Sequence, residues 1–127
     1  MTPADEAVRT GTKMGAYGNN RTINYTWTLS EDGPIKRVAN LSISHSKHDY
    51  RSSEDSFVIT LRNMTVEDKG QWTSTSFGVF DGVNLGRIPA GLRYSAKNLD
   101  KAAGEALAML NEAYNWGNES VLAIFAA

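Results

Sequence analysis

Residues 39–66 read ANLSISHSKHDYRSSEDSFVITLRNMTV, and this stretch decides the fold. Two segments of alternating apolar and polar residues flank a polar loop, which predicts a β-hairpin. Because successive strand side chains point to opposite faces, one face of the hairpin is apolar and carries Leu41, Ile43, Phe57, Ile59 and Leu61. The other face is mostly polar and carries Asn40, Ser42, Ser44, Val58, Thr60 and Arg62. The apolar face needs a cover, whereas the polar face can remain solvated.

The composition is that of a single domain spanning residues 1–127. A net charge of −1 with 21% charged residues gives no overall basic character, so a polyanion would have to bind at a local basic face. The chain has no cysteine, which excludes a disulfide framework, a thiolate nucleophile and a cysteine-based metal site. No apolar run has the length of a signal peptide core or a membrane span. We therefore expect synthesis in the cytoplasm and no membrane partner.

Further strands are predicted before the hairpin. Residues 7–29 read as two strands joined near residues 18–20, where Gly-Asn-Asn accepts the positive φ of a tight turn. SEDGP at residues 30–34 is a turn, after which residues 35–46 form the first arm of the hairpin.

Strands also follow the hairpin. Residues 71–80 predict a strand, and Asp81-Gly82 is a two-residue turn signal that leads into a last strand ending near Tyr94. Pro89 in this last strand cannot donate a ladder hydrogen bond, so the strand is expected at a sheet edge or bulged there.

The hydrophobic period then changes to that of a helix. Apolar residues recur every three or four positions over residues 98–116, with Asn98 as a suitable N-cap and Gly117 as a terminator. A second, shorter helix at residues 118–126 is apolar around most of its circumference. That segment is difficult to leave in water.

The predicted fold class is therefore α+β. An N-terminal β-hairpin and an antiparallel sheet occupy residues 1–94, and two C-terminal helices occupy residues 95–127.

The sequence pattern provides little for catalysis or metal binding. His45 and His48 in HSKHD have the spacing of a metal pair with Asp49, but loop histidines are usually solvated, so we predict no metal and no cofactor. Nucleophile elbows, phosphate-binding glycine loops and dinucleotide fingerprints are absent from the sequence. We predict that the protein is not an enzyme and has no small-molecule substrate. A small α+β enzyme stays open as an alternative, because folding can bring two carboxylates together.

The polar strand faces are the remaining candidates for function. Hydroxyl, amide and guanidinium groups on an open sheet contact phosphates and unpaired RNA bases, although the same groups also suit a solvated surface. The candidate RNA-binding residues are Asn40, Ser42, Ser44, Thr60, Arg62, Arg87 and Arg93.

This order of elements resembles the coat proteins of single-stranded RNA bacteriophages of the levivirus type. AVRTGTKMGAYGNNRTINYTWTL is similar to the family's first hairpin, and KRVANLSISHSK followed by DSFVITLRNMTV is similar to its adjacent central strands. GLRYSAKNLDKAAGEALAMLNEAYNW resembles its last strand and long helix. The resemblance extends over nearly the whole chain and rests on pattern and order.

The resemblance implies an interlocked homodimer in which the two helices of each subunit pack over the partner's sheet. It further implies assembly into an icosahedral shell, contact of the inner sheet face with single-stranded genomic RNA, and repression of translation through an RNA hairpin. The protein would be made in the cytoplasm of a bacterial host and reside in the virion. VEDKGQ and FDGVN are both candidates for the loop between dimers. The implied dimer interface comprises Leu99, Ala103, Ala106, Leu107, Leu110, Tyr114, Val121, Leu122 and Phe125.

Two alternatives remain at the level of sequence. A monomer can fold its helices onto its own sheet, which would also shelter the apolar end of the chain. The other alternative is an immunoglobulin-like β-sandwich recognition domain. DSFVITLRNMTVEDKGQW resembles the stretch that leads into the tyrosine corner of that fold, with Trp72 in place of the usual tyrosine. Trp27 would then be the core tryptophan.

Overall fold

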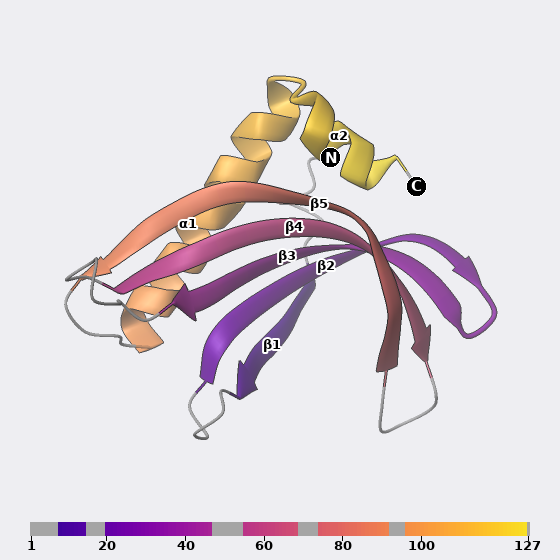
Figure 1. Cartoon of the computed structure of the whole chain (residues 1–127), viewed down its shortest axis with the longest axis horizontal. Helices are drawn as coiled ribbons and strands as arrows, with labels where there is room; N and C mark the ends of the chain where they lie inside the picture. The colour runs from indigo at the N-terminus through magenta and orange to yellow at the C-terminus, as the bar shows by residue number, and fades with distance from the viewer. Residues whose placement is uncertain (1–7, 15–19, 47–54, 69–73, 92–95, 127) are drawn as a thin grey trace.

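The computed structural model describes residues 8–14, 20–46, 55–68, 74–91 and 96–126 (Figure 1). These ranges contain five strands followed by two helices. The elements are β1 (Val8–Met14), β2 (Asn20–Asp32), β3 (Ile35–Ser46), β4 (Asp55–Asp68), β5 (Ser74–Gly91), α1 (Ala96–Asn115) and α2 (Glu119–Phe125). The predicted α+β class, with a sheet before two C-terminal helices, is confirmed.

The five strands form one antiparallel sheet in the order β1-β2-β3-β4-β5, so each strand lies beside its neighbours in the chain. The predicted central hairpin is β3–β4, in which Leu41 lies opposite Leu61 and Ile43 opposite Ile59. A slip of one residue would move these side chains to the other face, so burial of the apolar face fixes this register. Figure 1 shows the strands bent into an arch, with α2 and the C-terminal part of α1 beyond its outer side.

Both helices cover the apolar face of the chain's own sheet. Leu99, Ala103, Ala106 and Leu110 recur at helical spacing on α1 and are at most 2% exposed. In α2, Val121 and Ile124 are fully buried. The remaining members of the core are Ile23, Trp27, Ala39, Leu41, Ile43, Phe57, Ile59, Leu61 and Ala102. The sequence left open whether the helices pack on the sheet of their own chain or on that of a partner. In the structure of the single chain they pack on their own sheet.

The helix ends differ slightly from the prediction. α1 begins at Ala96, so Asn98 lies within its first turn instead of capping it. Gly117 has a φ of 71° and separates the helices as predicted. Asn118 is the N-cap of α2, and its Oδ1 accepts hydrogen bonds from the backbone N–H groups of Ser120 at 3.1 Å and Val121 at 3.2 Å.

The predicted turn at Asp81-Gly82 is wrong. β5 runs without a break from Ser74 to Gly91, and Asp81 and Gly82 lie opposite Asn63 and Arg62 of β4. A two-residue hairpin of type I′ needs positive φ at both central residues, and Gly82 is not among the described glycines with positive φ. The long β4 supplies a ladder partner here, and pairing with it prevails over the local turn preference.

This correction also bears on the two candidate loops between dimers. FDGVN, at residues 80–84, lies inside β5 and is not a loop. VEDKGQ begins in β4, and its residues 69–71 lie outside the described residues. β5 is an edge strand of the sheet, as Pro89 predicted.

An immunoglobulin-like sandwich needs two sheets packed face to face. Within the described ranges the strands form one sheet, and helices occupy the side where a second sheet would pack. Trp27 is buried, as the alternative expected, but its ring lies 5.4 Å from that of Phe125 in α2. Neither helix of the described chain is long and apolar enough to cross a membrane.

Asn63 is a buried polar residue that links the sheet to α2 through hydrogen bonds. It is 2% exposed; its Nδ2 donates to the Ile124 carbonyl oxygen at 2.8 Å, and its Oδ1 accepts from Arg37 Nε at 2.9 Å. Three elements, β3, β4 and α2, therefore meet at one amide. A buried carbonyl near a helix C-terminus is costly to leave without a donor.

We expect Asn63→Ala to lower the free energy of unfolding by about 2 kcal/mol, because it removes both hydrogen bonds from a buried position. Urea denaturation at a fixed protein concentration measures the change. The control is Asn115→Ala, which removes an exposed amide at the end of α1 and should change stability by less than about 0.5 kcal/mol. Equal urea midpoints for the two variants would show that the hydrogen bonds of Asn63 do not stabilise the fold.

Candidate nucleic-acid interface

The candidate site is the sheet face that points away from the helices. Strand alternation and register place its residues in rows across β2, β3, β4 and β5. One row consists of Thr22, Ser44, Val58 and Arg87, the next of Asn24, Ser42, Thr60 and Asn84, and the third of Thr26, Asn40, Arg62 and Gly82. We call this surface the polar face.

The centre of the polar face is recessed. Although no helix covers it, Asn24 and Ser42 are only 5% and 9% exposed. A hollow of about 340 Å³ lies over these rows. Its lining residues are Thr22, Asn24, Asn40, Ser42, Ser44, Val58, Thr60, Arg62 and Met64. The bend of the strands therefore gives the polar face a concave floor of hydroxyl and amide groups.

The hydroxyl groups on this floor contact one another. Ser44 Oγ lies 3.2 Å from Thr22 Oγ1 and 3.3 Å from Ser42 Oγ. A hydroxyl is both donor and acceptor and its hydrogen can rotate, so the cluster can present either a donor or an acceptor to a polar ligand.

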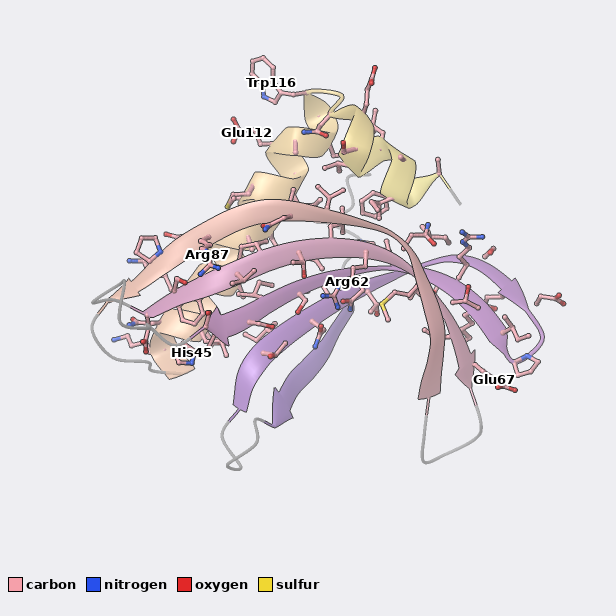
Figure 2. The ribbon with its side chains drawn as sticks, viewed as in Figure 1. His45, Arg62, Glu67, Arg87, Glu112 and Trp116 are labelled. Carbon is pink, nitrogen blue, oxygen red and sulfur yellow. The ribbon has the colours of Figure 1, made fainter. Side chains whose placement is uncertain are left out.

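Two arginines provide positive charge on the polar face. Arg62 is exposed, and it forms no ion pair or hydrogen bond with any other described residue. Arg87 is also exposed, and its Nη1 donates to Ser56 Oγ at 3.1 Å (Figure 2). Arg37 points to the other face, where it binds Asn63. Unlike Arg37, the two exposed guanidinium groups are available to an anion.

Most of the predicted RNA-binding residues are brought together. Asn40, Ser42, Ser44, Thr60 and Arg62 line one hollow, and Arg87 lies opposite Val58 on the adjacent strand. Arg93 lies outside the described residues.

The prediction missed Thr22 and Asn24, which line the same hollow from β2. The sequence feature that could have identified them is the alternation of polar and apolar residues in TINYTWT at residues 22–28. Alternation within β2 does not show which of its two faces lies on the same side of the sheet as the polar residues of β3. The register between β2 and β3 shows this.

The predicted dimer-interface residues lie mostly inside the single chain. Leu99, Ala103, Ala106, Leu110 and Val121 are at most 2% exposed against the chain's own sheet, whereas Leu107, Tyr114 and Phe125 are half-buried and Leu122 is 36% exposed. The fully buried members can contact a second copy only if α1 and α2 exchange between subunits.

His45 is not the solvated loop residue that the sequence predicted. It lies near the end of β3, with its side chain 1% exposed, and its Nε2 is 2.8 Å from Asp55 Oδ2 at the start of β4. His48 and Asp49 lie outside the described residues. No group of three metal-ligating side chains occurs in the described part of the chain.

Comparison of the chain with protein-family models, with curated proteins and with solved structures found no match.

Proposed function

We propose that this protein is a viral coat protein of the levivirus type. Its dimers would assemble into an icosahedral shell whose inner surface is the polar face, and that face would contact single-stranded genomic RNA. The observation that carries the proposal is the concentration of hydroxyls, amides and two exposed arginines on one concave, helix-free sheet face. The resemblance of the strand order and the C-terminal helices to that family supports the same reading.

The chemistry of the polar face suits RNA better than a neutral ligand. Guanidinium groups bind phosphates, while hydroxyl and amide groups bind the edges of unpaired bases. The chain as a whole has a net charge of −1, so attraction of a polyanion has to be local. Arg62 and Arg87 provide that local charge beside the hollow. The same face would bind a hairpin of the genome and so repress translation.

The homodimer can form in two ways in this fold. The helices can exchange, so that the contacts of α1 and α2 with the sheet form between two copies, as domain swapping allows. Alternatively, β5 can pair with its symmetry mate, because it is a sheet edge of 18 residues and exposed edges are templates for strand addition. Both routes are compatible with a shell whose polar face lies inside.

We expect the expressed protein to form closed particles that protect RNA from added nuclease. Electron microscopy would show the shells, and RNA extracted after nuclease treatment would show the protection. The control is RNA mixed with protein that has been denatured, which should be degraded. A monodisperse monomer at every protein and salt concentration tested would contradict the proposal.

A further inference from the structure

Trp116 is the most exposed large apolar side chain among the described residues. It is 83% exposed and lies in the turn between α1 and α2, beyond the β5 ribbon (Figure 2). The other large apolar side chains that are clearly exposed, Ile35 and Leu122, are 40% and 36% exposed. Tryptophan is one of the residues enriched among those that dominate the binding energy of protein interfaces.

A groove lies directly beside Trp116. It has a volume of about 640 Å³ and runs between β5 and the helices. Val83 and Leu85 line it from the strand, and Met109, Ala113 and Trp116 line it from the helical side. Polar residues also line it, namely Asn84, Glu112, Asn118 and Ser120, so the groove has apolar walls interspersed with polar groups. Its volume exceeds that of an indole ring.

The groove also borders an open sheet edge. β5 pairs with β4 on one side, and no described strand pairs with its other side. Backbone donors and acceptors along that side favour an occupant that brings a strand of its own. Among the described residues that line the groove, Glu112 is the only charged one, and its carboxylate disfavours RNA phosphates. These two features favour a protein as the occupant over RNA.

We infer that a second copy of this chain occupies the groove. Trp116 of each copy enters the groove of the other copy. A twofold interface brings the same patch of both subunits together, so it requires a patch that complements itself. An exposed Trp116, an adjacent groove with apolar walls and an open antiparallel edge on one patch meet that requirement. A single extended peptide would fill the edge and leave Trp116 in water. The inference rests on the proposed homodimer and assigns its anchor.

The first test is Trp116→Ala, measured as the dissociation constant of the dimer by sedimentation equilibrium. We expect the constant to rise at least tenfold, while the circular dichroism spectrum stays unchanged because Trp116 contributes little to the core. The matched control is Ile35→Ala, which truncates another exposed apolar side chain at the far end of the sheet and should leave the constant unchanged.

The second test uses the absence of cysteine from the chain. Single variants Glu112→Cys and Ser120→Cys place one thiol each on the helical side of the groove lining and keep Trp116. We expect a short bismaleimide to join the two variants when they are mixed, and this product to disappear when both also carry Trp116→Ala. Ile35→Cys mixed with Ser120→Cys should give no product.

The outcomes separate this inference from the proposed function. A wild-type dimer with unchanged affinity in Trp116→Ala and no cross-link across the groove would overturn the inference and leave the coat-protein proposal standing. A wild-type protein that is always monomeric would overturn both.

Discussion

Replacing Arg62 and Arg87 together by alanine should lower the affinity for single-stranded RNA about 100-fold at low salt, with each single change giving about tenfold. Among the described residues in the polar-face rows, these two guanidinium groups are the exposed positive charges, and each is expected to neutralise one phosphate. Counterion release then makes the logarithm of the binding constant fall with the logarithm of salt concentration. Losing both arginines should reduce that slope by about 1.4, because each phosphate contact on a single strand contributes about 0.7. Filter binding with unassembled dimers over a range of salt concentrations measures both quantities.

The matched control is Lys97→Ala with Lys101→Ala. These lysines are exposed on α1, on the helical side of the sheet, and their loss changes the net charge by the same amount. If RNA bound at the polar face, this pair should change the affinity less than about threefold. An equal loss for both pairs would show that net charge controls binding and would remove the polar face from the proposal. Arg62→Lys should retain most of the affinity, because lysine also binds phosphate.

The chain's own helices cover the apolar face of its sheet. Val121, Ile124 and Phe125 are costly to expose, and the family resemblance implied a second copy as their cover, with the chain's own sheet as the alternative. In the structure Val121 and Ile124 are fully buried within one chain, and Phe125 packs against Trp27 and Tyr114. Shelter for the tail therefore no longer requires a partner. The case for a dimer now depends on the open β5 edge and the exposed Trp116.

The sequence was sufficient to predict most of the secondary structure, because each core element has a strong period. The alternation over residues 39–46 and 55–66 predicted β3, β4 and the two faces that they carry. The helical period over residues 98–116 predicted α1 to within two residues at each end. Five polar-face residues were identified from the same alternation, since facing strands in register extend one face across the sheet.

The errors occurred where distant parts of the chain decide the structure. Asp81-Gly82 has the local preference of a turn, but a strand pairs with β4 at these residues. The burial of His45 depends on Asp55, ten residues away across a hairpin. Whether the helices cover their own sheet or another is a choice between equal apolar surfaces, which hydrophobic periodicity does not distinguish.

The pair formed by His45 and Asp55 ties the end of β3 to the start of β4. Its Nε2–Oδ2 distance is 2.8 Å, and the two side chains are 1% and 8% exposed. The His45 ring also packs against Phe57, with 6.1 Å between ring centroids. A carboxyl group at this depth is stable only because it has polar partners. The pair therefore holds the hairpin end closed beside the core.

We expect Asp55→Ala to lower the free energy of unfolding by about 3 kcal/mol, because it leaves a buried imidazole without this carboxylate. His45→Leu should cost a similar amount by leaving the carboxylate without the imidazole. The double variant should cost clearly less than the sum, since it removes both polar groups and leaves an apolar site. Urea denaturation of the four proteins gives the coupling energy. The control Glu31→Ala, whose partner Lys36 lies 3.9 Å away on an exposed surface, should change stability by less than about 0.5 kcal/mol. Additive losses in the double variant would show that the two residues stabilise the fold independently and that their contact contributes nothing.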